Sequence, residues 1–331
     1  MKVVTGFSAY RLLGNDFIFK TEFGTLNHTL VVAGTISPLL RKENMEEFAE
    51  DLPLENISNV FYRNAFDNTF YGPGWSEEDN SKCYQSKISS ISIDENCTSV
   101  HDDAKGRERF DPHGGENIPV IDPYYHFTRS LWSSIGLEDL PQIKVGMNHD
   151  LTATIAHEET LYEILDHMES ISCNFSADSL FKFLGRIDKR RNGSWQEATD
   201  VVVSLLSKLK LLQPGLVIVD GSGLSRLNRL TTSFLARLVY ISSKEGEIFL
   251  RHLPSPGKGT LRNRLLEMRD LDIMAKTGSL AGVSSLTGYI ERFKLSFSII
   301  VNDSNNNEEE IRNVVDEILV DAIHRYEKVS E

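Results

Sequence analysis

The sequence predicts a mixed α/β (α+β) fold, in which helices flank a mostly antiparallel sheet and a β-rich domain is inserted. Three observations indicate this fold. Short strand-like pieces among Asp, Asn, Ser and Gly fill residues 43–115, whereas helical spacing of apolar residues dominates after about residue 150. Three successive strand patterns and one long amphipathic helix then complete the chain.

The first elements show where the insertion begins. Residues 3–13 have the apolar spacing of a helix that ends at Gly14-Asn15, and two strand-like runs at 17–23 and 30–33 form a hairpin. We therefore expect a discontinuous main domain, residues 1–18 and 150–331, and an inserted domain, residues 19–149.

The second half supplies most of the main domain. Apolar residues share one helix face over residues 161–168, and further helices are predicted at 177–184 and 198–211. A buried strand at 216–219 enters the tight turn Asp220-Gly221-Ser222-Gly223, which is expected to be a structural corner. Strands at 273–280, 285–291 and 295–301 and a helix at 308–328 follow.

Composition excludes several classes of protein. The net charge of -13 argues against a nucleic-acid partner. The sequence has no run of about 18 apolar residues, so no transmembrane segment is predicted. Three cysteines show no metal-ligand spacing, one at least is unpaired, and a Cys83–Cys97 bridge stays open. Five histidines lack ligand spacing and are expected to have surface or core roles: His113, His126, His149, His157 and His167.

Lys276-Thr277-Gly278-Ser279 is the strongest local motif, and it lies on a predicted strand. An ammonium and a hydroxyl at a sheet edge can hold a substrate carboxylate, while the glycine lets a peptide lie against the strand. Taken alone, this motif is more often a solvated strand end.

Ser172-Cys173-Asn174 is the second motif, between two predicted helices. A hydroxyl and an amide two residues apart can face one cleft, where the first relays a proton and the second fixes geometry. The alternative is that a Ser or Asn here only caps the following helix.

Other segments fall in the same order as in one known family: Met1-Lys2-Val3-Val4-Thr5-Gly6, Gly72-Pro73-Gly74-Trp75, Ser92-Ile93-Asp94-Glu95-Asn96 and Asp220-Gly221-Ser222-Gly223. With the two motifs above, the chain resembles the class C low-molecular-mass penicillin-binding proteins, the D-alanyl-D-alanine carboxypeptidase and endopeptidase family. The resemblance runs nearly end to end and implies a penicillin-binding/β-lactamase-like serine hydrolase domain. Lys2 would be the lysine of the family's Ser-x-x-Lys motif.

The resemblance implies a serine-type D-Ala-D-Ala carboxypeptidase that forms an acyl-enzyme with peptidoglycan peptides and is acylated by β-lactam antibiotics. Lys2 would be the general base, Ser172 would pass the proton to the leaving D-alanine, and Asn174 would position Lys2. Lys276 and Thr277 would bind the terminal carboxylate beside Gly278, and the N–H of Ser279 would complete the oxyanion hole. The resemblance implies no metal and no cofactor.

The nucleophile is the main departure, since the serine of a Ser-x-x-Lys motif ending at Lys2 would lie two positions before Met1. Either the reading frame begins upstream, with a signal peptide and that serine, or the chain is a natural remnant without hydrolytic activity. We favour the first because Met1 falls inside a helical turn. The start itself lacks signal-peptide character, although the resemblance implies a periplasmic or cell-envelope protein.

Three other serines match the bare Ser-x-x-Lys pattern, at Ser179, Ser207 and Ser255, and surface roles are expected for them. Cys173 stands where the family usually carries aspartate and is expected to point inward as a small apolar group. Two alternative functions stay open: a catalytically inactive peptidoglycan-binding or vestigial homologue, and, less in keeping with the long insertion, a β-lactamase.

Overall fold

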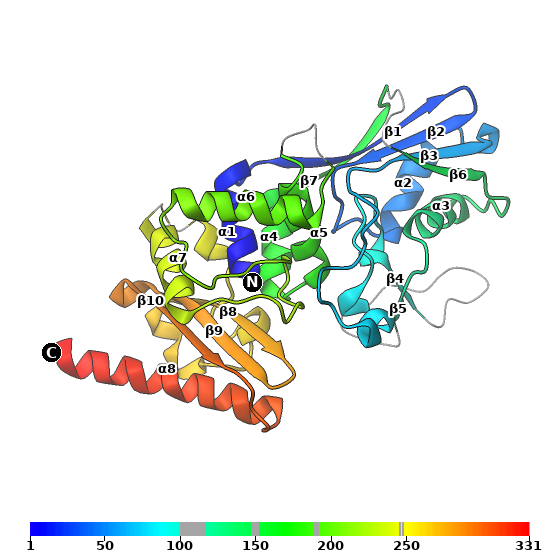
Figure 1. Cartoon of the computed structure of the whole chain (residues 1–331). Coiled ribbons are helices and arrows are strands. Elements are labelled where there is room, and N and C mark those ends of the chain that lie inside the picture. The colour runs from blue at the N-terminus through cyan, green and yellow to red at the C-terminus, as the bar shows by residue number, and fades with distance from the viewer. Residues whose placement is uncertain (100–116, 147–151, 188–191, 245, 247, 331) are drawn as a thin grey trace.

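In the computed structural model, the described residues are 1–99, 117–146, 152–187, 192–244, 246 and 248–330. Part of the expected irregular region, residues 100–116, therefore lies outside the description, as do His113 and His149. The described chain forms a helix-and-sheet main domain and a second domain inserted after the first helix (Figure 1).

Five helices build the core of the main domain: α1 (Lys2–Leu13), α4 (Leu161–Ser170), α5 (Asn174–Leu184), α6 (Trp195–Lys208) and α7 (Thr232–Lys244). Helix α1 lies among the others (Figure 1), and every residue from Lys2 to Ala9 is buried. A helix that is buried all round needs neighbours on every side, and its Val4 and Phe7 belong to the same apolar cluster as residues of α4 to α7. The helix predicted at 3–13 is confirmed, and it ends at Gly14 with φ 83°.

An antiparallel meander of β8 (Ile273–Leu280), β9 (Val283–Ile290) and β10 (Leu295–Val301) confirms the three predicted strands. Side chains alternate across this sheet, so Met274 packs against the helical core while Ala275 packs on the other face. Helix α8 (Glu308–Ser330) covers that second face with Val315, Leu319 and Ile323. The amphipathic helix expected from residue 308 is therefore confirmed.

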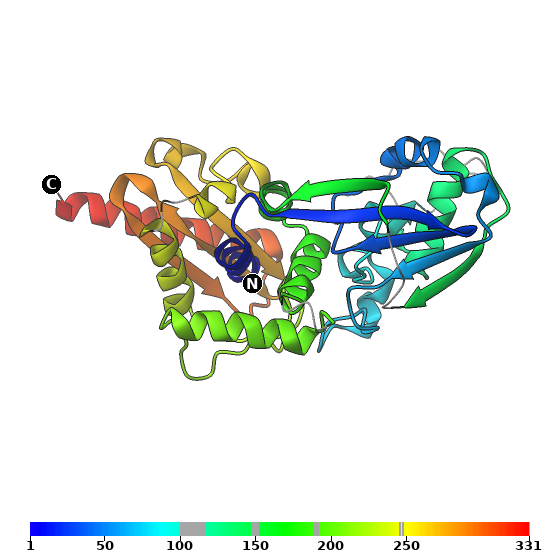
Figure 2. The ribbon, with the colours of Figure 1, turned by 90° about the horizontal axis from the view of Figure 1, so that it is seen from above.

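The inserted domain is built on a five-stranded sheet in the order β6-β3-β2-β1-β7. Its strands are β1 (Ile18–Leu26), β2 (Thr29–Gly34), β3 (Asn59–Arg63), β6 (Gln142–Gly146) and β7 (Ile155–Thr160). The predicted hairpin is β1–β2, paired antiparallel with Phe23 opposite Val32, whereas β3 lies parallel to both β2 and β6. Strands β1 and β7 pair with each other and lead out of and back into the main domain (Figure 2).

Two helices, α2 (Met45–Glu50) and α3 (Pro123–Ser134), share an apolar core with this sheet. Phe23, Phe127 and Trp132 fill the centre of that core. Between β3 and β4 (Cys97–Ser99), which pairs with β5 (Asn117–Pro119), the chain forms three short 3₁₀ turns rather than strands: Glu77–Ser81, Cys83–Gln85 and Asp94–Asn96. The irregular character predicted for this region is thus seen in its described part.

Two expectations about the chain differ from the structure or stay untested. The strand expected at 216–219 was wrong, because this segment makes only one isolated bridge, between Val217 and Arg229. Strand β7 lies beyond residue 149 and still pairs with the inserted sheet. The domain boundaries expected at 18 and 149 stay predictions, and strand pairing favours a return near residue 160.

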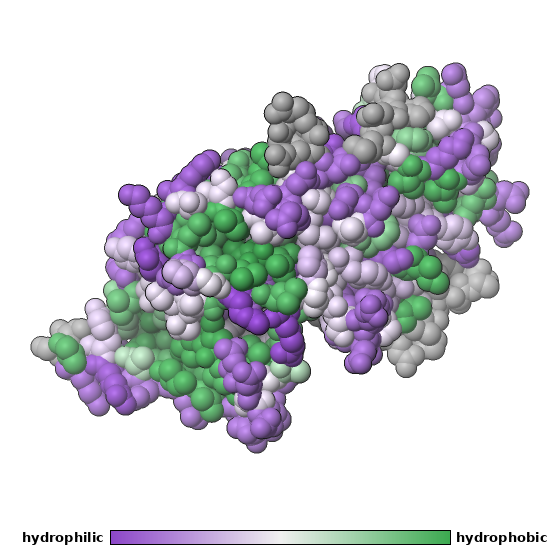
Figure 3. All heavy atoms as spheres, in the orientation of Figure 1, coloured by the Kyte–Doolittle hydropathy of each residue, from purple (hydrophilic) through white to green (hydrophobic). Residues whose placement is uncertain are grey.

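The surface view shows apolar side chains gathered over the helices and sheet of the main domain, whereas the visible face of the inserted domain is more mixed (Figure 3). Among the described helices, none combines the length and the apolar character that crossing a lipid bilayer requires.

Candidate active site

Lys2 lies at the first turn of α1 and joins three segments that are far apart in the sequence. Its side chain is buried, at 8% exposure, and its Nζ donates to Asn174 Oδ1 at 2.6 Å and to the Ser222 carbonyl at 3.2 Å. Lys2, which matches the lysine of the Ser-x-x-Lys motif, is therefore in direct contact with Asn174 of the Ser-x-Asn motif.

The Asp220 turn fixes the end of α1 that carries Lys2. Thr5 Oγ1 donates to the Gly221 carbonyl at 2.7 Å, and Asp178 Oδ1 accepts from the Gly221 and Ser222 N–H groups at 2.8 and 2.9 Å. A Cβ at Gly221 would stand 2.3 Å from the Ala177 carbonyl, so only glycine allows this close approach to α5. The expected structural corner is confirmed.

The Ser172-Cys173-Asn174 segment connects α4 to α5. Ser172 has a φ of 64°, and Cys173 is the N-cap of α5, whose Sγ accepts from the Ser176 N–H at 3.4 Å. Helix capping is thus done by the middle residue, which leaves the Asn174 amide to bind Lys2 through Oδ1 and the Tyr84 carbonyl through Nδ2, at 2.9 Å.

Lys276 lies on β8, the last strand in the order β10-β9-β8, and shares the face of Met274 that looks toward the helical core. Its side chain is 5% exposed, and its Nζ donates to the Thr277 carbonyl at 3.2 Å. Thr277 and Gly278 are half-buried and Ser279 is exposed, so the outer edge of β8 is open over these three residues.

Burial is the main cause of the pKa shifts in this cluster. It lowers the pKa of Lys2, against the opposing charge of Asp178, and it lowers the pKa of Lys276 to about 7, an effect that Glu169 opposes and Lys2 reinforces. Burial and the neighbouring Asp220 raise the pKa of Asp178 to about 8. The cluster therefore contains two lysines that release their protons more readily than exposed lysines do.

The structure unites most of the residues that the sequence singled out. Lys2 and Asn174 are hydrogen-bonded, and Lys276 interacts with Lys2 through charge. Ser172 adjoins this pair through the backbone, and Thr277 to Ser279 continue β8 from Lys276. The chemical roles expected for these residues stay predictions.

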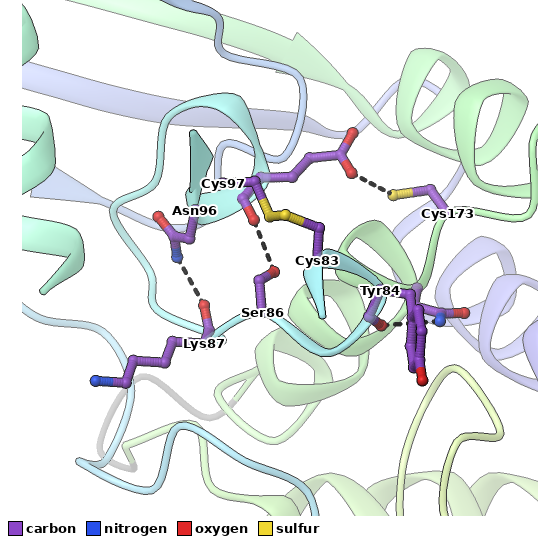
Figure 4. Close-up of a disulfide and its surroundings, with 9 residues drawn as sticks. Cys83, Tyr84, Ser86, Lys87, Asn96, Cys97 and Cys173 are labelled. Atoms are coloured by element: carbon purple, nitrogen blue, oxygen red, sulfur yellow. Dashed lines mark hydrogen bonds between the residues drawn. A yellow bond between two sulfur atoms is a disulfide. The ribbon is translucent and has the colours of Figure 1, made fainter. Parts of the chain in front are cut away.

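The bridge left open between Cys83 and Cys97 is formed, and its contact with the Ser-x-Asn loop was not predicted from the sequence. A disulfide joins Cys83 and Cys97, whose Cα atoms are 5.9 Å apart (Figure 4). Inside the loop that it closes, the Tyr84 carbonyl accepts from Asn174, and Glu95 Oε2 accepts from the Cys173 thiol at 3.3 Å. The inserted domain therefore holds the Ser-x-Asn segment from outside the main domain.

Glu95 is the centre of a hydrogen-bond network. Arg41 Nη2 lies 2.9 Å and His167 Nε2 3.1 Å from Glu95 Oε1. Burial favours the neutral form of Glu95, yet the bond to His167 and the charge of Arg41 outweigh it and lower its pKa. Cys173 is buried in the main apolar cluster, so the expectation that it points inward is confirmed. Burial raises the pKa of its thiol, which in addition donates a hydrogen bond to Glu95.

Within the part of the chain that is described, one group has donor types that suit a metal ion, namely Glu95, His167 and Cys173, with donor atoms within 4.8 Å of one another. The Arg41 guanidinium binds the same carboxylate oxygen as His167, and its positive charge would repel a cation there. We therefore interpret the group as a hydrogen-bond network.

The alternative Ser-x-x-Lys pair on α5 is part of the core, so the surface role expected for it was wrong. Ser179 is 1% exposed, and the Lys182 side chain is fully buried. Lys182 Nζ donates to Asp67 Oδ1 at 2.7 Å and to the Thr69 carbonyl at 2.8 Å, which ties α5 to the segment after β3. A serine buried in this way is not open to a substrate.

Comparison with known proteins extends this description. A family model described as D-Ala-D-Ala carboxypeptidase 3 (S13) matches residues 1–121 and 140–322. A D-alanyl-D-alanine carboxypeptidase of Actinomadura sp. is 35% identical over 153 residues, which cover 43% of this chain and 28% of that protein. Penicillin-sensitive carboxypeptidase A of Dictyostelium discoideum is 29% identical over 230 residues, 61% of this chain and 43% of the relative. The chain thus spans less than half the length of these two relatives.

A third relative is similar over most of the chain. The D-alanyl-D-alanine carboxypeptidase DacB of Haemophilus influenzae is 24% identical over 369 residues, covering 87% of this chain and 76% of the relative. Its crystal structure, penicillin binding protein 4, matches with a TM-score of 0.77 at 20% identity over 93% of this chain and 85% of that one. The same protein has been solved in complex with a β-lactam. At this identity the structural match shows the fold.

Proposed function

Because the chain belongs to the D-Ala-D-Ala carboxypeptidase 3 (S13) family, we propose that it is a serine DD-peptidase that hydrolyses the terminal D-Ala-D-Ala bond of peptidoglycan peptides. The observation that carries the proposal is the buried contact of Lys2 Nζ with Asn174 Oδ1, at 2.6 Å, with Lys276 in the same charge cluster. Cleavage of cross-links is a second reaction that this site would support.

Lys2 is the general base in this mechanism. A serine three residues before Lys2 would share its helix face, and burial lowers the Lys2 pKa toward the neutral amine that can accept the serine proton. Asn174 holds the amine in place, while its own position is fixed by the Tyr84 carbonyl. The serine oxygen then attacks the carbonyl carbon of the penultimate D-alanine.

The remaining motif residues bind the substrate and complete the acyl transfer. The Lys276 ammonium and the Thr277 hydroxyl bind the terminal carboxylate, and the peptide lies along the open edge of β8 at Gly278. The N–H groups of Ser279 and of the nucleophile stabilise the oxyanion, and Ser172 delivers the proton to the departing D-alanine amine. Water then hydrolyses the acyl-enzyme and releases the shortened peptide.

β-Lactam antibiotics would acylate the same serine, as the bound β-lactam of the Haemophilus relative suggests. A periplasmic or cell-envelope location suits both the substrate and the Cys83–Cys97 disulfide, since disulfides persist in oxidising compartments. Both statements rest on the proposed activity.

Fluorescent penicillin labelling tests the function directly. Two chains are compared, one with serine and one with alanine at the third position before Lys2, each followed by one further residue and then by Met1 to Glu331. We expect a covalent adduct and D-alanine release from a pentapeptide with the serine chain alone. A folded serine chain that forms no adduct contradicts the proposal. If that chain still binds muropeptides in calorimetry, the non-catalytic peptidoglycan-binding alternative replaces it, and rapid nitrocefin turnover would instead indicate a β-lactamase.

A further inference from the structure

Asp220 is a buried carboxylate at the corner of the site, and the proposed mechanism leaves it unused. It is 0% exposed, and among the residues that the structure describes four groups donate to it. Oδ1 accepts from the Gly223 N–H at 2.8 Å and from Asn228 Nδ2 at 2.9 Å. Oδ2 accepts from the Ser225 N–H at 2.7 Å and from Trp75 Nε1 at 3.0 Å. All four donors are N–H groups, which suit an ionised carboxylate and bind it more strongly than they bind a neutral acceptor.

One of these hydrogen bonds leads to Lys2 through a single peptide group. The peptide between Ser222 and Gly223 donates its N–H to Asp220 Oδ1, and its carbonyl, that of Ser222, accepts from Lys2 Nζ at 3.2 Å. A peptide group is planar, so an acceptor that fixes its N–H also fixes the direction of its carbonyl. Asp220 therefore determines where one of the two acceptors of Lys2 lies.

The side chain of Lys2 has as many acceptors as a neutral amine can use. Such an amine has two N–H bonds and one lone pair, and the lone pair is what accepts the proton of a serine. In the described part of the chain, Asn174 Oδ1 at 2.6 Å and the Ser222 carbonyl at 3.2 Å accept from Lys2 Nζ. When both N–H bonds are directed in this way, one direction is left for the lone pair. The Ser222 carbonyl thus orients the base together with the Asn174 amide.

Trp75 reaches Asp220 from the inserted domain. It ends the Gly-Pro-Gly-Trp segment after β3, where a Cβ at Gly72 would stand 2.4 Å from Trp75 Nε1, so glycine makes room for the indole. In the same segment, the Pro73 carbonyl accepts from Ser225 Oγ at 2.6 Å. Two hydrogen bonds therefore join this segment to the turn that carries Asp220.

We propose that Trp75 and Asp220 are positioning residues for the general base: the indole N–H holds Asp220, and Asp220 holds the peptide group whose carbonyl orients the Lys2 amine. This inference rests on the proposed function. The link is one of position, because burial is the main cause that lowers the pKa of Lys2, and the charge of Asp220 opposes it less than that of Asp178. The inserted domain thus acts on the base through a second contact, in addition to the hydrogen bond that holds Asn174.

Trp75→Phe removes the indole N–H and keeps an aromatic ring in its place. In the chain with the added serine, stopped-flow labelling at several concentrations of fluorescent penicillin separates the Kd of the first complex from the rate constant of acylation. We expect the rate constant to fall about 5-fold with Kd unchanged, since the carboxylate site on β8 is untouched. An unchanged rate constant overturns the proposal. So does a loss that appears in Kd as well, because it would indicate a merely structural role.

Trp195→Phe is the matched control. Trp195 Nε1 donates to the Thr69 carbonyl at 3.0 Å, and its ring lies 5.5 Å from that of Trp75. This variant therefore also loses one indole hydrogen bond to the segment after β3, but no hydrogen bond to Asp220. It should be acylated at the rate of the unmodified serine chain, and a loss equal to that of Trp75→Phe overturns the proposal.

A double-mutant cycle tests whether Trp75 acts through Asp220. Asp220→Asn turns an amide N–H toward N–H donors and should slow acylation about 10- to 100-fold. Adding Trp75→Phe should slow it no further, whereas two losses that add in full overturn the proposal. Urea unfolding checks the fold of each variant, and if Asp220→Asn does not fold, the resonances of Trp75→Phe decide.

These resonances separate the inference from the proposed function. The ¹⁵N resonance of the Lys2 side chain, assigned with Lys2→Arg, and the exchange rate of the Gly223 amide proton are measured in the 331-residue chain. In Trp75→Phe the resonance should shift and the amide should exchange faster, and in Trp195→Phe neither should change. An unshifted Lys2 resonance overturns the inference even if the enzyme is active. A shifted resonance, with a serine chain that is never acylated, overturns the proposed function and leaves the link from Trp75 to Lys2 in place.

Discussion

The Cys83–Cys97 disulfide offers a test that links stability to the active site. Replacing both cysteines by alanine opens the loop that contains Tyr84 and Glu95, the residues that contact Asn174 and Cys173. We expect the variant to lose stability and, in the chain with the added serine, to react more slowly with penicillin.

The structure sets the size of both the loss of stability and the slowing of acylation. The cysteines are separated by 14 positions, and closing a loop of about 15 residues contributes about 3 kcal/mol to the free energy of unfolding. That is roughly a 100-fold change in the unfolding equilibrium. A weakened Tyr84–Asn174 hydrogen bond, at about 1 kcal/mol, should slow acylation roughly 5- to 10-fold.

Urea unfolding gives the first quantity and stopped-flow labelling with fluorescent penicillin gives the second. Dithiothreitol should reproduce both effects in the serine chain that keeps both cysteines and should do nothing further to the double variant. If the double variant is within about 1 kcal/mol of that chain and is acylated at the same rate, the disulfide does not support the site as we reason.

Three further substitutions probe the cluster. Asn174→Ala removes the 2.6 Å partner of Lys2 and should slow acylation about 10- to 100-fold with little change in the urea midpoint; an unchanged rate would contradict the role of Asn174. Cys173→Asp brings a second carboxylate to within about 3.3 Å of Glu95 and should cost at least about 2 kcal/mol in urea unfolding, whereas Cys173→Ser should cost less than about 1 kcal/mol. Asp178→Asn tests pH dependence: the folded pKa of about 8 exceeds the unfolded value of 3.8, so the charge of Asp178 lowers stability as the pH rises from 4 to 8. The unmodified chain should therefore lose stability relative to Asp178→Asn over this range, by at most about 1.4 kcal/mol per pH unit, and parallel pH curves would refute this.

Elements with a regular apolar period could be predicted from the sequence. These elements are the helix at 3–13, the hairpin, the last three strands and the final helix. Their apolar residues recur at helix or strand spacing, and this spacing can be read from neighbouring residues alone. The segment at 216–219 has the apolar run of a strand but makes one bridge only, since the next residues give their N–H groups to Asp178 and Asp220. Such long-range side-chain acceptors have no local pattern.

The candidate site shows the same division. Lys2, Asn174 and Lys276 belong to short motifs with a resemblance behind them. Glu95 lies in a segment that also carries the resemblance and Tyr84 in none, and the sequence does not show that either residue contacts the Ser-x-Asn loop. Glu169 did leave a signal, because it falls four residues after Leu165 and thus on the apolar stripe of its helix. An acidic residue at such a position indicates a buried charge, and its partner becomes known only in three dimensions.

The central place of α1 has a consequence for how the polypeptide is made. Its Val4 and Phe7 find their neighbours on α4 to α7, which the ribosome delivers at least about 150 residues later. At 5–20 residues per second, that delay is on the order of 10 s. During this interval the inserted domain can fold around its own sheet and core. The apolar residues of α1 stay exposed to solvent, so α1 needs another surface, such as that of a chaperone, to avoid aggregation.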